Sequence, residues 1–168
     1  MHRLFGSRAL LVILLAIPVL GLGGTATYVA LNGEEPNDGH YIAGRELQKQ
    51  DRLVEAIAEF DEAVKVNASS LKAITARGDA FYALGKIRQA SEDYEKAIGL
   101  RSNLEHLSGT PEFGAENKAL AGAYTGRALI QTARGDDMEA QRSLSEVVLI
   151  GVDVAEAREA VEGIKAQR

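Results

Sequence analysis

Residues 53–64 read LVEAIAEFDEAV, and residues 89–98 read QASEDYEKAI. The two stretches share one order of small and large side chains, at positions 34 residues apart. The matched pairs are Ala56 with Ala90, Phe60 with Tyr94, Ala63 with Ala97 and Val64 with Ile98. Residues three and four apart lie on the same face of a helix. The spacing therefore predicts two copies of one helix, each with a large aromatic residue between two alanines.

Another helix is expected before this one in each copy. Gly44 and Gly78 are also 34 residues apart, and a glycine lets a neighbouring helix approach closely because no side chain intervenes. Gly85 is placed for a left-handed turn between the two helices of the second copy, and Asp51 takes the equivalent position in the first. Each unit is thus predicted to be a pair of antiparallel helices.

This 34-residue period and the order of small and large residues resemble the tetratricopeptide-repeat (TPR) family. The resemblance implies a short right-handed α-solenoid of about three helical hairpins, in an all-α chain. The predicted units are residues 37–70, residues 71–104 and a degenerate third unit at residues 121–154, in which Gly135 and Ala140 keep the spacing of Gly85 and Ala90.

Four further segments are predicted around these units. Residues 32–40 are a polar, turn-rich linker. Residues 105–120 are an insertion, in which Thr110 and Pro111 are suited to begin a helix. Residues 153–167 are a C-terminal capping helix, opened by a capping box formed by Asp153 and Glu156. A solenoid needs such a terminal helix because its last repeat has no neighbour.

The N-terminal segment has a different composition. Residues 9–31 contain no charged side chain over 23 positions, long enough for a transmembrane helix. The only charged residues before it are Arg3 and Arg8, which predict a cytoplasmic basic N-terminus at residues 1–8. An alternative is a signal peptide cleaved near Ala26. Both alternatives place the repeats on the far side of the membrane.

Composition argues against several functions. After residue 33 the chain has 17 Lys and Arg against 24 Asp and Glu, so nucleic acid is not an expected partner. The chain has no cysteine, and its three histidines, His2, His40 and His106, lack metal-ligand spacing. No phosphate-binding loop or nucleophile motif is present. We therefore expect no catalytic residue, no metal and no cofactor.

In TPR-like proteins the first helix of each unit lines a concave groove that binds a partner. By this resemblance, the groove residues here are Tyr41, Arg45, Gln48 and Lys49 in the first unit, Lys72, Thr75, Asp79 and Tyr82 in the second, and Thr125, Leu129 and Thr132 in the third. Phe113 in the insertion is a further candidate contact, because long loops between repeats often carry function.

These observations predict a non-enzymatic adaptor that is anchored in a bacterial-type inner membrane and binds a protein or peptide in the periplasm. The membrane is contacted through residues 9–31. One alternative is a structural accessory subunit whose span packs within a membrane complex. Another is an exported soluble binding protein. The small core of about three repeats also suggests self-association into a homo-oligomer.

Overall fold

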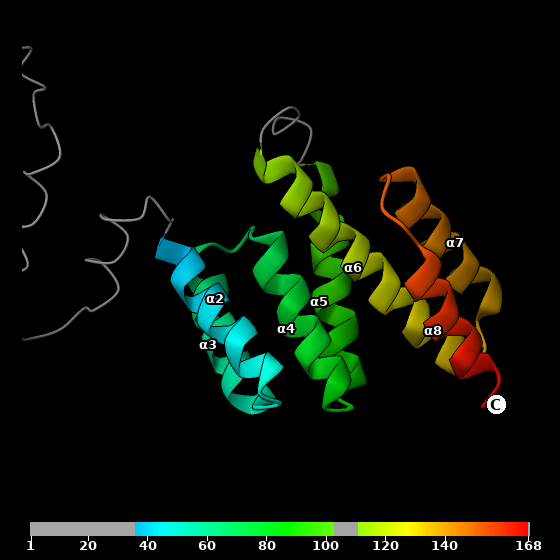
Figure 1. Cartoon of the computed structure of the whole chain (residues 1–168), viewed down its shortest axis with the longest axis horizontal. Helices are drawn as coiled ribbons and strands as arrows, with labels where there is room; N and C mark the ends of the chain where they lie inside the picture. Colours follow the sequence, from blue (N-terminus) through cyan, green and yellow to red (C-terminus); the bar gives the residue numbers. More distant parts are fainter. Residues whose placement is uncertain (1–35, 103–110, 168) are drawn as a thin grey trace, which may run out of the picture.

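A computed structural model describes residues 36–102 and 111–167 of the chain. These residues form seven helices and no strand (Figure 1). The helices are α2 (Pro36–Lys49), α3 (Leu53–Val66), α4 (Leu71–Ala83), α5 (Ile87–Gly99), α6 (Pro111–Arg134), α7 (Asp137–Leu149) and α8 (Ala155–Lys165). The described part is all-helical, as predicted.

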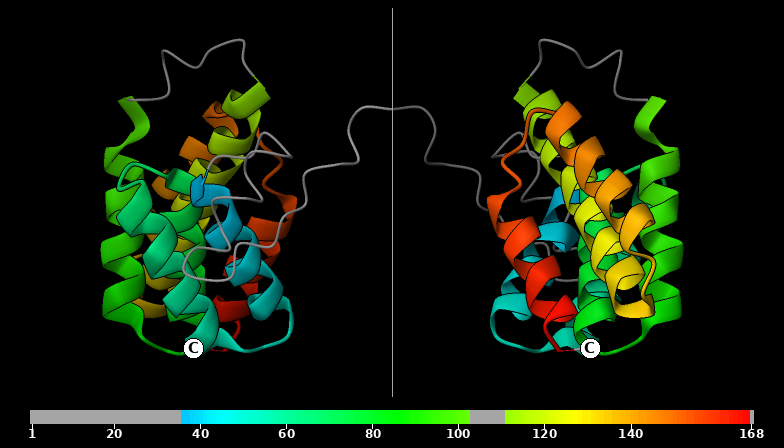
Figure 2. Two further views of the ribbon diagram at one scale, coloured as in Figure 1. Left: turned by 90° about the vertical axis from the view of Figure 1, so that its left-hand side faces the viewer. Right: turned by 90° about the vertical axis from the view of Figure 1, so that its right-hand side faces the viewer.

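The helices pack as three consecutive hairpins followed by one more helix. Within the hairpins α2 contacts α3, α4 contacts α5, and α6 contacts α7. The first helices also contact one another, α2 with α4 and α4 with α6, and α8 continues this layer against α6 (Figures 1 and 2). Helix α8 therefore lies where the first helix of a fourth unit would be.

Close packing at the predicted glycines holds each of the first two hairpins together. A side-chain carbon added at Gly44 would lie 2.5 Å from Cε1 of Phe60, and one at Gly78 would lie 2.9 Å from Cε1 of Tyr94. Both aromatic rings are buried. The sequence prediction that these glycines allow close helix approach is therefore confirmed.

The turns inside the hairpins also follow the prediction. Gly85 has a φ of 70° and Asp51 a φ of 60°, so both residues are left-handed. Aspartate is one of the few residues with a side chain that occupies this region readily. The chain can thus reverse direction directly after α2 and α4.

Two predicted segment boundaries differ from the structure. Helix α2 begins at Pro36, so residues 36–40 are helical instead of linker. Helix α6 begins at Pro111, inside the predicted insertion, and continues to Arg134. The segment before residue 121 is rich in residues that favour a helix, and Leu120 within it is buried in the core. The prediction that Pro111 opens a helix agrees with this start.

The start of α8 differs from the predicted capping box. The Oδ1 atom of Asp153 accepts a hydrogen bond of 2.9 Å from the backbone N–H of Ala155. Glu156 makes no reciprocal bond with the backbone among the described residues. The N-cap of α8 is Val154, which makes no side-chain capping bond, so the predicted capping box is not formed.

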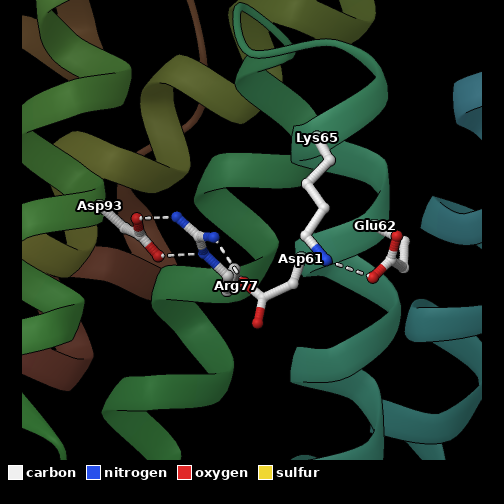
Figure 3. Close-up of polar contacts among 5 residues, drawn as sticks. All are labelled: Asp61, Glu62, Lys65, Arg77 and Asp93. Carbon is white, nitrogen blue, oxygen red and sulfur yellow. Dashed lines mark hydrogen bonds and ion pairs between the residues drawn. The ribbon is translucent and has the colours of Figure 1, made fainter.

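An ion network joins three consecutive helices. In Figure 3 the guanidinium of Arg77, on α4, points between Asp93 on α5 and Asp61 on α3. Its Nε and Nη2 atoms donate to the two carboxylate oxygens of Asp93 at 2.8 and 2.6 Å, and Nη1 donates to Asp61 at 2.6 Å. The bond to Asp93 is the main cause that raises the pKa of Arg77 above its ordinary value.

The same arrangement recurs more weakly in the third hairpin. Arg127 lies 50 residues after Arg77, and its Nε donates to the hydroxyl of Ser143, 50 residues after Asp93, at 3.1 Å. Its Nη1 approaches Glu95 at 3.5 Å. A neutral hydroxyl thus replaces the paired carboxylate, so this arginine holds its hairpin less strongly.

No helix among residues 36–102 and 111–167 is long and apolar enough to cross a membrane. The predicted transmembrane segment at residues 9–31 and the basic segment at residues 1–8 lie outside the described residues. Their prediction is not tested by the structure.

Candidate functional site

The predicted groove residues of α2 lie at one end of the layer of first helices. The ring of Tyr41 packs against Phe60, with ring centroids 6.2 Å apart. Nζ of Lys72 lies over the Tyr41 ring, 5.5 Å from its centroid. Arg45 donates to the side chain of Gln48 at 2.8 Å. Lys49 pairs with Glu46 at 3.2 Å on the exposed surface. These side chains form a polar surface, and none of them lines the cavity described below.

Two predicted groove residues are buried instead. The Thr75 hydroxyl donates to the backbone carbonyl of Ala119 at 3.2 Å. Thr132 is 0% exposed, and its hydroxyl donates to the carbonyl of Ala128 at 2.8 Å. Both hydroxyls are satisfied inside the protein, so neither residue is available to a partner. Helix α6 covers Thr75 because its added N-terminal turns pack on α4.

The four remaining predicted residues lie together in one cavity of about 470 Å³. It is partly open and is lined by helices α4, α6 and α8 with Tyr94 of α5. The predicted residues that line it are Asp79, Tyr82, Thr125 and Leu129. The others are Tyr94, Gly122, Gly126, Asp153, Glu156, Ala157 and Ala160. Helix α6 contacts both α4 and α8, and all three helices line the cavity. The cavity therefore lies over α6, between α4 and α8.

Small residues of α6 make room for this cavity. An added side-chain carbon at Gly126 would lie 2.7 Å from Cε1 of Tyr94 and closer still to Cζ. One at Gly122 would lie 3.2 Å from Cγ2 of Thr75. These glycines let α6 approach α4 and α5, and they leave the cavity without side chains at its base.

Among the described residues, the charged side chains that line the cavity are all negative. Asp79, Asp153 and Glu156 contribute carboxylates, and no basic residue of the described ranges lines it. Glu156 has no hydrogen-bond or ion-pair partner among the described residues. Tyr82, Tyr94 and Thr125, which also line the cavity, each carry a hydroxyl group. The cavity therefore favours a cationic guest over an anionic one.

Asp79 is the most perturbed of these carboxylates. The Tyr94 hydroxyl donates to its Oδ1 atom at 2.9 Å. Burial raises the pKa of Asp79 to about 6, and the hydrogen bond from Tyr94 and the charge of Arg45 counteract only part of this effect. Burial also raises the pKa of Tyr94, as does the charge of Asp79. Among the described residues, Asp79 is thus a carboxylate without an ion-pair partner in a partly dry site.

Sequence reasoning did not find the α8 side of the cavity. Residues 153–167 were predicted only to cap the solenoid, although Asp153, Glu156 and Ala160 line the cavity. The sequence signal for this packing was the apolar pair Ala157 and Val161. In the structure both residues are buried, and α8 contacts α6. Phe113 lies in the first turn of α6, and its side chain is outside the described residues, so its contact with a partner stays a prediction.

A family model of the tetratricopeptide repeat matches residues 71–104, a range that includes all of α4 and α5. This is the range predicted from sequence for the second unit. No curated protein sequence matches the chain. Tetratricopeptide repeats are modules of protein–protein interaction, so the matched repeat indicates a role in binding another protein.

The perturbed pKa of Asp79 predicts a pH-dependent stability. The pKa of about 6 in the folded protein lies above the ordinary value of 3.8, so between these values the folded state holds an extra proton. The free energy of unfolding from this group therefore falls as pH rises from about 4 to about 6. Asp79→Asn is expected to stabilise the chain at pH 7.5 by at most about 3 kcal/mol, and by much less at pH 4.5.

Urea titrations of both proteins at the two pH values measure this difference. Glu159→Gln, on the exposed side of α8, is the control, and its effect should be the same at both pH values. An Asp79→Asn effect that did not shrink at pH 4.5 would show that burial does not disfavour this charge.

Proposed function

We propose that this chain is a non-enzymatic adaptor that binds a protein or peptide partner in the groove formed by α4, α6 and α8. The observation that carries this proposal is the cavity over α6, which brings Asp79, Tyr82, Thr125 and Leu129 together. The tetratricopeptide-repeat match at residues 71–104 supports it, because it covers α4 and α5. A half-open cavity with polar and apolar walls suits side chains of a polypeptide.

The adaptor is further proposed to be held at a membrane by residues 9–31, with the repeats outside the cytoplasm. The support is the run of 23 uncharged residues preceded only by Arg3 and Arg8. In this arrangement the groove would serve the assembly of an envelope complex. A cleaved signal peptide would instead release the repeats as a soluble binding protein.

Site-specific photo-crosslinking tests the groove. A photoreactive amino acid at Tyr82 is expected to yield a discrete crosslinked product in cells. The matched control places it at Met138, which is 82% exposed on α7, away from the cavity. The proposal fails when Tyr82 gives no product, or when both positions give the same products.

Fractionation of bacterial cells tests the anchor separately. A C-terminally tagged full-length chain should appear in the membrane fraction and be digested by protease added to spheroplasts. A shortened product in the soluble periplasmic fraction would show cleavage instead. Replacing residues 9–31 with an unrelated span distinguishes an adaptor, which should keep its function, from a structural subunit, which should lose it.

A further inference from the structure

The chemistry of the groove narrows the kind of partner, and this inference rests on the proposed function. The cavity is lined by a partly buried carboxylate, that of Asp79, and by an exposed one, that of Glu156. Asp79 accepts its hydrogen bond through Oδ1, and its Oδ2 accepts none from the described residues. Asp79 lines the cavity, and its Oδ2 is not among the buried side-chain atoms that lack a partner, so this oxygen keeps contact with solvent and can meet a group that enters. Glu156 lines the same cavity from α8.

The walls between these carboxylates are apolar enough to hold a hydrocarbon stem. Leu129 of α6 and Ala157 and Ala160 of α8 line the cavity, together with the ring of Tyr82. Lysine and arginine pack their aliphatic stems on apolar surface while the charged head reaches polar groups. An aromatic ring adds favourable contact with a cation.

We propose that this cavity receives a lysine or arginine side chain of the partner, with its cationic head between the carboxylates of Asp79 and Glu156. The partner is thus a polypeptide segment with a basic residue at its centre. The guest supplies the close positive charge that no described residue gives Asp79, so part of the cost of burying this carboxylate is offset on binding.

Proton linkage follows from the surroundings of Asp79. The groups that face it are Arg45 from α2, Tyr82 from its own helix, Tyr94 from α5, Asp153 from the turn before α8, and Glu156 from α8. Helix α6 contributes only uncharged residues to the cavity. A bound cation favours the ionised form of Asp79, whose pKa in the free protein is about 6. Binding therefore weakens as pH falls below about 6, where the carboxylate must first lose a proton.

Selection from a random peptide library tests the proposal. The full-length chain in non-ionic detergent is immobilised, and displayed 12-residue peptides are selected at pH 7.5. The expected result is binders enriched in lysine or arginine. One such sequence, made without Asp, Glu or His and with blocked ends, is then used as the fluorescent probe. Its matched control replaces the conserved basic residue of the binders with norleucine, which keeps the stem and removes the charge.

Glu156→Gln is expected to weaken binding of the basic probe about tenfold and to leave the norleucine probe nearly unchanged. Glu159→Gln removes the same charge from the exposed face of α8 and should change neither affinity. Between pH 7.5 and 5.0 the wild-type affinity for the basic probe should fall up to about tenfold. Asp79→Asn should remove this pH dependence.

The outcomes separate the two proposals. A selection that yields no binder at all counts against the adaptor function, and the inference falls with it. Binders without basic residues, or a basic probe whose affinity does not change in Glu156→Gln, overturn the inference alone and leave the groove as a binding site.

Discussion

Replacing Arg77 with methionine is expected to lower the free energy of unfolding by about 3–5 kcal/mol. The side chain of Arg77 is 17% exposed and that of Asp93 is 7% exposed, so the change leaves a buried carboxylate without its cation. Methionine keeps most of the aliphatic volume, so the loss measures mainly the unpaired charge. Since a domain of this size has about 5–15 kcal/mol of stability, this is a large fraction.

Urea titration of the full chain in non-ionic detergent, followed by far-ultraviolet circular dichroism, measures this loss. Arg88→Met is the matched control. Arg88 is 85% exposed, its nearest carboxylate oxygen on Glu92 lies 3.9 Å away, and its loss should cost less than about 1 kcal/mol. Adding Asp93→Asn to the Arg77 variant removes the orphaned charge and should recover part of the loss. Equal effects of the two arginines, or no recovery, would contradict this explanation.

Figure 3 shows how the contacts of Arg77 differ from those of an exposed ion pair. Arg77 joins α4 to α3 and α5 through three hydrogen bonds, whereas the neighbouring pair of Lys65 and Glu62 lies within the exposed surface of α3. Only the first arrangement crosses between helices of successive hairpins. The network therefore supports the stacking that the groove requires.

The repeat pattern in the sequence was sufficient to predict the helical hairpins. Gly44 and Gly78, paired with Phe60 and Tyr94 at a period of 34 residues, correctly predicted the close contacts within the first two units. Local turn chemistry correctly predicted the left-handed positions at Asp51 and Gly85. Both features depend on residues close in sequence or on strict periodicity, so they can be predicted from a single amino-acid sequence.

The groove was only partly predictable because it depends on tertiary packing. The position of each residue within its repeat predicted that Thr75 and Thr132 line the groove, as Asp79 and Leu129 do. In the structure Thr75 and Thr132 are buried. The added N-terminal turns of α6 shift the third unit out of the 34-residue period. The repeat period therefore does not show which side chains these turns cover. The network of Arg77 was missed for a related reason, since Asp61 and Asp93 each lie 16 residues from it on other helices.

The second large effect is expected at Gly126. Gly126→Ala should lower the free energy of unfolding by about 2–4 kcal/mol, although alanine favours a helix over glycine by about 1 kcal/mol. The added methyl group would overlap the ring of Tyr94, which is 1% exposed. The ring cannot retreat, because Gly78 of α4 also lies against it and its hydroxyl is bound to Asp79.

Gly163→Ala is the matched control, because nothing lies within 4 Å of a side-chain carbon added there on α8. This change should stabilise the chain by up to about 1 kcal/mol in the same urea titration. Replacing Tyr94 with leucine should make the alanine at position 126 far less costly, so the two changes should be strongly non-additive. Equal effects of alanine at the two glycines would mean that the helices separate freely. In that case the base of the cavity would not be fixed by the contact between α6 and Tyr94.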